Sequence, residues 1–129
     1  MLPVPDSATL VPDPAHFFDE FCGLHDARVV GLFWHVERAE LVIRMDAIYG
    51  GMLQPDEFPE VDRAEILAKQ VREVLLDLHP ELFDGQPWIM DTTATPGEDG
   101  RGVKIRVACA TGSISFVCDE IWFCPEQEN

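Results

Sequence analysis

The alternating pattern between residues 103 and 124 constrains the fold most strongly. In VKIRVACA (103–110) apolar residues alternate with basic ones, and SISFVCDEIWFC (113–124) resumes the alternation after Thr111-Gly112. A period of two is typical of a strand with one buried face, and the intervening dipeptide is typical of a tight turn. The segment therefore predicts a β-hairpin. The alternation changes phase near Asp119-Glu120, which predicts a β-bulge or burial on both faces.

A second hairpin is predicted between residues 27 and 48. Residues 27–36 and 41–48 are rich in β-branched and aromatic side chains, and a short polar connection separates them. The later run alternates, so we expect one of its faces to be buried. The earlier run contains VVGLFWHV, which is apolar at nearly every position, so we expect a central strand that is covered on both faces.

The N-terminal region predicts an extended arm followed by a short helix. Residues 1–14 contain four prolines, each of which lacks a backbone donor and disfavours helix in the residue before it. In AHFFDEFCG (15–23) three phenylalanines would share one side of a short helix that ends at Gly23. For a chain of 129 residues we expect an arm over 1–14 and a single globular domain over 15–129.

Residues 62–78 fit two alternatives. As a helix, the segment begins with Asp62 and Glu65 at a spacing close to a capping box, and its apolar residues form a helical stripe. As strands, residues 64–68 and 74–78 alternate with a period of two. The fold expected is mainly β, or α+β if the helix forms. It is a twisted antiparallel sheet of about six strands in a small sandwich or partly closed barrel.

The charge balance limits the classes of partner. The chain has 24 acidic and 9 basic residues, which gives a net charge of −15. Such a chain repels phosphate backbones and anionic membrane surfaces, so we expect no nucleic-acid or membrane partner, whereas a basic protein would be attracted. The sequence has no signal-peptide pattern and no apolar run of bilayer length, so we expect a cytoplasmic protein. Its four cysteines are then expected to be reduced and to serve as small buried residues.

An acidic segment is the strongest candidate for a binding surface. In PDEFPEVDRAE (55–65) a single arginine opposes five acids. Such a cluster can steer a basic partner from a distance and pair with it at contact, while the alternative is an ordinary solvated loop. The candidate partner-binding residues are Asp56, Glu57, Glu60, Asp62 and Glu65.

Trp88 is the candidate for ligand binding among the aromatic residues. It lies in GQPWIM, between Pro87 and Ile89, where we expect a half-exposed ring. Its alternative role is to anchor the loop or join the core. Trp34 and Trp122 lie in expected strands, where core packing explains a tryptophan.

The pair His25-Asp26 raises the question of catalysis or metal binding. No nucleophile elbow, phosphate loop or zinc-protease motif accompanies the pair in the sequence, so we expect it to stabilise a turn and expect no catalytic residue or cofactor. Cys22-x-x-His25 has metal-ligand spacing, and Cys118 and Cys124 could complete a tetrahedral set. The spacing of the last two cysteines is too loose for a zinc motif, so we expect no metal site.

Three segments carry a resemblance to known proteins. LHDARVV (24–30), AEILAKQVREVLLDL (64–78) and ISFVCDEIWF (114–123) resemble a set of small bacterial β-rich proteins that open with an F/L-H-D-A-x-V hairpin motif. Some of that set are similar to immunity proteins of polymorphic toxin systems. The resemblance implies a β-rich fold and shifts residues 64–78 towards strands, with the helix still an alternative.

These features together predict a non-enzymatic protein-interaction protein. It would be immunity-like and would mask a basic toxin or effector domain through its acidic surface. The alternative is a small-molecule-binding or regulatory module that uses a sheet cavity near Trp88. Exposed edge strands would also allow a homodimer.

Overall fold

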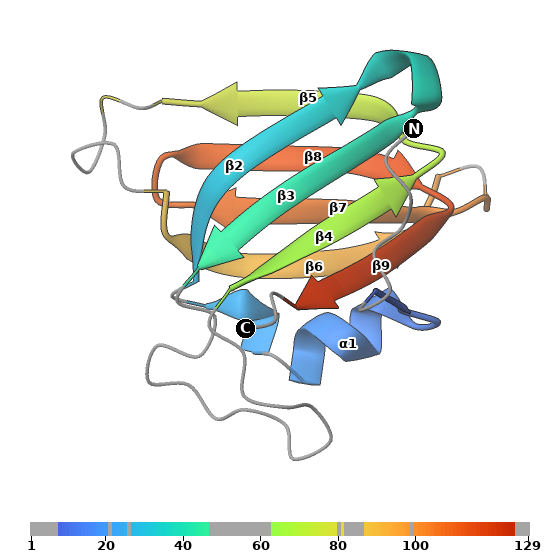
Figure 1. Ribbon diagram of the computed structural model, residues 1–129, viewed down its shortest axis with the longest axis horizontal. Helices are drawn as coiled ribbons and strands as arrows, with labels where there is room; N and C mark the ends of the chain where they lie inside the picture. The colour runs from blue at the N-terminus through green and yellow to red at the C-terminus, as the bar shows by residue number, and fades with distance from the viewer. Residues whose placement is uncertain are drawn as a thin grey trace.

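Two antiparallel sheets face each other in the computed structural model of the protein (Figure 1). The apolar faces of both sheets meet in one core, so the predicted β-sandwich is confirmed. The structure describes residues 8–20, 22–25, 27–46, 63–79, 81, 87–98 and 100–125.

Sheet A is the five-stranded layer. In spatial order its strands are β1 (Thr9–Leu10), β9 (Glu120–Pro125), β4 (Ala64–Lys69), β3 (Glu40–Asp46) and β2 (Arg28–His35). The predicted hairpin of residues 27–48 is the β2–β3 pair, and a single 3₁₀ turn, η2 (Val36–Arg38), forms its tip. Leu41, Ile43 and Met45 are buried, as the alternation in β3 predicted.

Sheet B is the four-stranded layer. In spatial order its strands are β5 (Arg72–Leu78), β8 (Gly112–Cys118), β7 (Val103–Cys109) and β6 (Ile89–Pro96). The predicted C-terminal hairpin is the β7–β8 pair, and its turn lies at Ala110-Thr111. Ile105, Val107 and Ile114 face the core, as the pattern predicted.

Residues 62–78 provide strands, so the helix alternative for this segment is wrong. Ala64, Ile66 and Ala68 all point into the core from β4, which lies between β3 and β9 at the centre of sheet A. At Gln70, whose φ is 57°, the chain turns and enters sheet B as β5. Pairing on both sides of β4 outweighs the helix propensity of the segment, which is a small local effect.

The strand β2 lies at an edge of sheet A, which corrects the prediction of a central strand. None of its eight residues is fully buried, and it pairs with β3 alone among the described strands. The apolar run VVGLFWHV does not alternate, and this pattern predicts burial on both faces. In the structure its side chains line an edge of the sandwich and stay partly exposed.

The phase change near Asp119-Glu120 marks a crossing between the sheets and not a β-bulge. The chain leaves sheet B at Cys118 and enters sheet A at Glu120, so the face that points inward changes. The Asp119 N–H donates to the Lys69 carbonyl at 3.0 Å, which places this crossing beside the β4–β5 crossing. The two points at which the chain changes layer are therefore adjacent.

Arg72 ties the two crossings together. Its Nη1 donates to the Gln70 carbonyl at 2.9 Å and to Asp119 Oδ1 at 2.9 Å, and its Nη2 donates to the Arg101 carbonyl at 3.3 Å. Gly102 packs so closely here that a Cβ would collide with the Cys118 carbonyl. One guanidinium thus joins three segments of the chain.

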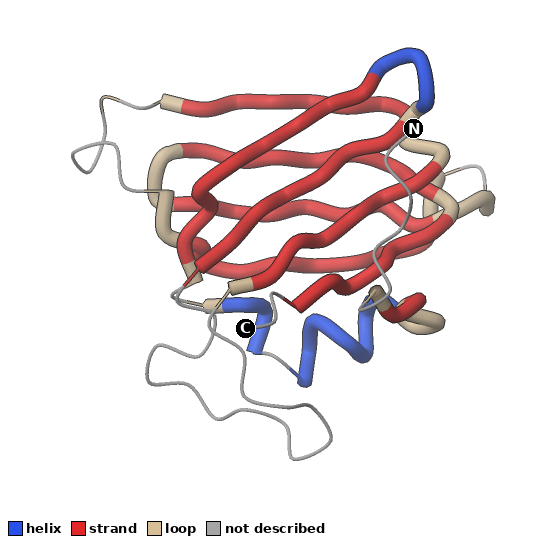
Figure 2. Tube along the Cα trace, viewed as in Figure 1, coloured by secondary structure: helices blue, strands red, loops and turns tan. Residues whose placement is uncertain are grey.

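The short N-terminal helix is confirmed as α1 (Pro14–Glu20). Pro14 takes the first helical position, and Asp13 Oδ1 accepts the His16 N–H at 3.2 Å as an N-cap. The buried rings of Phe17 and Phe18 point into the sandwich, and Phe17 lies 5.1 Å from Phe123 between ring centroids. With η1 (Cys22–Leu24), the helix covers the side of the sandwich where β6 and β9 lie (Figure 2).

Candidate functional site

Glu65 alone of the five predicted acidic residues can be placed. Asp56, Glu57, Glu60 and Asp62 lie outside the described residues. Glu65 is half-buried in β4, and its Oε1 lies 3.4 Å from Arg44 Nη2. Because Arg44 shares the charge of Glu65, this residue contributes less negative potential than its formal charge indicates.

Two of the described bases near the acidic segment, Arg28 and Arg44, bind carboxylates. The acidic segment belongs to the connection between β3, which ends at Asp46, and β4, which follows Arg63. The Arg28 guanidinium donates to both oxygens of Asp46, at 3.0 Å from Nε and 2.6 Å from Nη2. These bonds and the charge of Asp46 raise the pKa of Arg28. The two arginines on these strands, Arg28 and Arg44, therefore each bind a carboxylate of the described part of the chain.

Trp88 closes a corner between the two sheets. The ring is 37% exposed, as expected for a half-exposed side chain, and the Arg28 guanidinium carbon lies 5.6 Å from the ring centroid. The backbone nearby joins β2 to β6, since the Ile89 N–H donates to the Ala27 carbonyl at 2.7 Å. This arrangement gives Trp88 an anchoring role, while its binding of a ligand stays a prediction.

A groove of about 580 Å³ lies between α1 and β6, away from Trp88. Asp19 and Asp91 supply carboxylates to it, and the backbone of Gly23 packs directly against Asp91 Oδ1. Thr92 also lines the groove, and its buried hydroxyl has no hydrogen-bond partner among the described residues. Asp19, Asp91 and Thr92 carry no motif in the sequence, because they lie on a helix and a strand that only the fold brings together.

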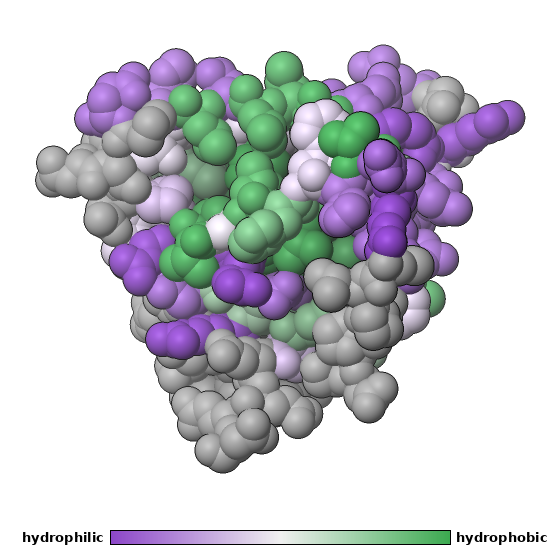
Figure 3. Space-filling model, turned by 45° about the horizontal axis from the view of Figure 1, so that its top comes forward, coloured by the Kyte–Doolittle hydropathy of each residue, from purple (hydrophilic) through white to green (hydrophobic). Residues whose placement is uncertain are grey.

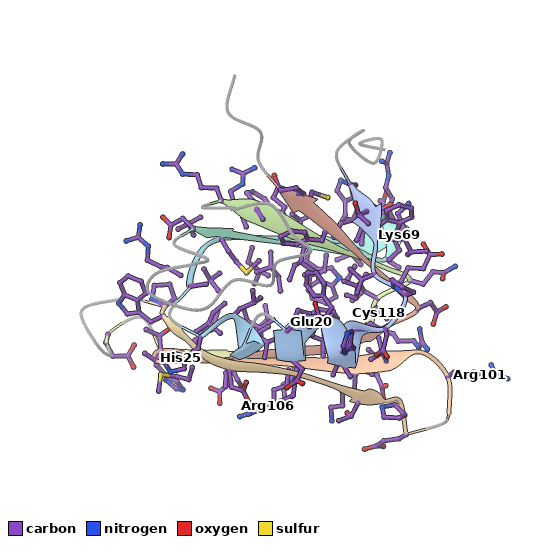
Figure 4. The ribbon with its side chains drawn as sticks, turned by 90° about the horizontal axis from the view of Figure 1, so that it is seen from below. Glu20, His25, Lys69, Arg101, Arg106 and Cys118 are labelled. Atoms are coloured by element: carbon purple, nitrogen blue, oxygen red, sulfur yellow. The ribbon has the colours of Figure 1, made fainter. Side chains whose placement is uncertain are left out.

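The described cysteines belong to the core. Cys109, Cys118 and Cys124 are buried free thiols, and Cys118 lies between the two sheets in Figure 4. Burial, with the charge of Asp119, raises the pKa of Cys118 to about 12, and burial raises the pKa of Cys124 to about 11. Raised thiol pKa values disfavour the thiolate that metal binding and nucleophilic attack require.

Of the alternative metal set, His25, Cys118 and Cys124 lie within the described part of the chain. There, no three His, Cys, Asp or Glu residues gather as ligands would. Asp26 and the side chain of Cys22 lie outside the described residues. His25 sits in the turn that follows η1.

The side of the sandwich where β2 and β5 form the edges is open, and no pattern in the sequence predicts it. Trp34 pairs with the buried Leu41, so it faces the interior, and Leu76 faces the interior beside the buried Ile114. Nevertheless Trp34 is 48% exposed and Leu76 is 42% exposed. Figure 3 shows apolar residues gathered on this side of the molecule. We call this surface the open edge. Its large exposed apolar residues are Val30, Phe33, Trp34, Val36, Leu75, Leu76 and Leu78.

The outer face of sheet A differs from the open edge because charged side chains cover its apolar residues. Val42, Leu67 and Trp122 lie side by side across three strands. The Lys69 ammonium lies 5.5 Å from the Trp122 ring centroid, and the Trp122 indole donates to Glu120 at 3.1 Å. Leu67 is accordingly only 7% exposed. Phe33 pairs with Val42 and so also lies on this face, beside the β2 edge; it is 54% exposed, and the Arg44 guanidinium carbon is 5.4 Å from its ring centroid. Away from β2 this face is therefore largely protected, whereas the open edge is not.

Comparison with known proteins gives the chain no relatives. No family model matches it, and no curated protein or solved structure is significantly similar to it. Among the helices of the described residues, none is long and apolar enough to cross a membrane.

Proposed function

We propose that the protein is a non-enzymatic interaction protein that binds a basic partner, such as a toxin or effector domain, and masks it. The supporting observation is the separation of charge along the chain. Residues 47–62 hold four acids and no base, so all nine bases lie elsewhere in the chain. Two of the nearest bases, Arg28 and Arg44, already hold Asp46 and Glu65.

The mechanism is electrostatic steering followed by steric cover. A net charge of −15 draws a cationic protein towards this one, and the acidic segment pairs with it at contact. The sandwich then blocks the cationic cleft of the partner. Asp56, Glu57 and Glu60 carry the contact, and Glu65 contributes less because Arg44 shares its charge.

The test compares two triple variants with the same net charge. One variant carries Asp56→Asn, Glu57→Gln and Glu60→Gln, and the control carries amides at three exposed acids elsewhere. The probe is the most basic protein that the tagged chain retains from its native lysate at low salt. The control substitutions are Glu37→Gln, Glu73→Gln and Glu98→Gln.

The first variant should slow association about tenfold at low ionic strength and flatten its salt dependence, because steering depends on local charge. The control should change the association rate much less. Equal effects of the two variants would mean that only the total charge acts, and the assignment of the acidic segment would then be wrong.

A small-molecule-binding module is the second candidate, and the groove between α1 and β6 favours it. Asp19, Asp91 and the unpartnered Thr92 hydroxyl would suit a ligand that carries an amine. Titration with short aliphatic diamines, followed by tryptophan fluorescence and calorimetry, tests this candidate. A heat of binding that is lost in Asp91→Asn would support it, and no heat would remove it.

A further inference from the structure

We propose that the open edge is the interface of a homodimer in which two copies pack β2 and β5 against each other. The inference is independent of the basic partner, because it uses a different surface. The connection that contains the acidic segment leaves sheet A after Asp46 and rejoins it after Arg63, whereas the open edge follows β2 and β5. Figure 1 places β5 on the side of the sandwich away from α1.

Within the described residues, the core is incomplete at this edge. On the opposite side, α1 inserts Phe17 and Phe18, which are 6% and 1% exposed. At the open edge, no described helix covers the inward-facing side chains. Leu78 faces inward like Leu76 and is 41% exposed. Side chains that face the core are thus in contact with water. A second apolar surface would exclude that water.

β2 lacks the charged residues that usually protect an edge strand. Edge strands usually carry a charged residue, a proline or a short length that prevents pairing with another chain. Residues 29–35 of β2 contain no acid, no lysine, no arginine and no proline. A Val29–Gly31 irregularity interrupts the start of the strand, and the pairing from Gly31 to His35 is regular. Among the described strands, nothing pairs with the other side of the second half of β2.

The charge of the edge favours a second copy over a basic partner. β5 carries Glu73 and Asp77, and Asp77 is hydrogen-bonded to His79 at 2.8 Å, whereas residues 29–35 of β2 carry no acid for a basic partner to bind. The β2 half of the edge is therefore free of acids in a chain of net charge −15. Two copies repel each other through most of their surfaces, so they can associate only where acids are scarce. An identical open edge is such a surface.

The exposed apolar area of the open edge is close to that of a standard protein interface. Phe33 and Trp34 are about half exposed, so each offers about 100 Å² of apolar area. The five aliphatic residues add about 150–300 Å² at the usual area per side chain. The total of about 350–500 Å² is close to the apolar part of a standard interface, which is about 60% of 800 Å² per partner. The open edge is thus large enough for a stable dimer.

A twofold axis beside β2 satisfies all four observations. It brings β2 of one copy antiparallel to β2 of its partner and packs Trp34 and Leu76 around the new pair. Residues 29–35 of the two β2 strands carry no acid, lysine or arginine, so they pair without repulsion, and the apolar side chains of both β5 strands are covered at the same time.

Sedimentation velocity of the full chain over a wide concentration range tests the proposal. The wild type should form a dimer, and Trp34→Glu and Leu76→Glu should each raise the dimer Kd at least about thirtyfold, as loss of a buried anchor residue does. The matched control is Met90→Glu on β6, since Met90 is 54% exposed but lies outside the open edge. It should leave the dimer intact. Far-UV circular dichroism checks that each variant folds. If Trp34→Glu or Leu76→Glu does not fold, Leu78→Glu is measured in its place.

Salt separates this proposal from the basic partner. High salt should preserve or strengthen the dimer, because it screens the repulsion between two acidic chains, whereas it should weaken binding of a basic protein. A wild type that is monomeric at every concentration would overturn the proposal. Equal loss of the dimer in Met90→Glu, or dissociation of the dimer by salt, would overturn it as well.

Discussion

Replacing Arg72 should separate the two crossings of the chain and destabilise the whole fold. Arg72→Met keeps the aliphatic stem and removes three hydrogen bonds, to Gln70, Asp119 and Arg101. A charged hydrogen bond contributes about 1.5–3 kcal/mol when buried and an exposed ion pair less than about 1 kcal/mol. The Arg72 side chain is 36% exposed, so we expect an intermediate loss of about 1–2 kcal/mol in the free energy of unfolding.

The matched control is Arg44→Met. Arg44 makes one exposed ion pair, with Glu65 at 3.4 Å, and its guanidinium carbon lies 5.4 Å from the Phe33 ring centroid. Methionine can keep an apolar contact with that ring, so the substitution should cost about 0.5 kcal/mol. Urea unfolding monitored by tryptophan fluorescence gives both values, and the midpoint of thermal unfolding should fall by about 4 °C per kcal/mol. If the two variants differ by less than about 0.5 kcal/mol, the crossings do not depend on Arg72 and the reasoning is refuted.

Three further predictions concern the core, a turn and the thiols. Phe18→Ala should lower the free energy of unfolding by about 3–5 kcal/mol because the ring is 1% exposed, and urea unfolding would contradict this with a loss below about 1 kcal/mol. Gly112→Ala should cost more than about 2 kcal/mol, since its φ is 138° and a Cβ would collide with the Asp77 carbonyl; soluble yield and thermal unfolding measure the effect. The Cys118 pKa is raised from 9.0 to about 12, so the stability that its neutral thiol contributes is present below pH 9 and is lost as the pH rises towards 12. Urea midpoints should fall over that range, and less so in Cys118→Ala.

The strands with one buried face could be predicted from the sequence. In β7 and β3 the alternation of apolar and polar residues matches the burial in the structure, since each strand has one face towards the core and one towards water. Residues 62–78 were ambiguous because alanine and leucine suit both helix and strand. Only the pairing of β4 with β3 and β9, which are distant in the sequence, decides between them.

The open edge could not be predicted for a related reason. Trp34 and Leu32 in β2 have the composition of core residues, and no local pattern says whether a further layer covers them. The crossing at Asp119 could not be predicted either. The phase change there indicates that the inward-facing side of the chain has switched, but it does not indicate that the chain enters the other sheet. Of the acidic candidates, Glu65 alone can be compared with the structure, and its contact with Arg44 arises from a cross-strand pair.

The adjacent crossings also set the order in which the protein can fold during its synthesis. β4 needs β9 beside it, yet β5, β6, β7 and β8 are all translated between these two strands. At about 5–20 residues per second, the ribosome needs several seconds to deliver β9, and one edge of β4 is unpaired throughout that time. The nascent chain thus carries an apolar, strand-ready segment before its partner exists. Slowing translation between residues 70 and 119 should therefore increase aggregation without any change in the amino-acid sequence.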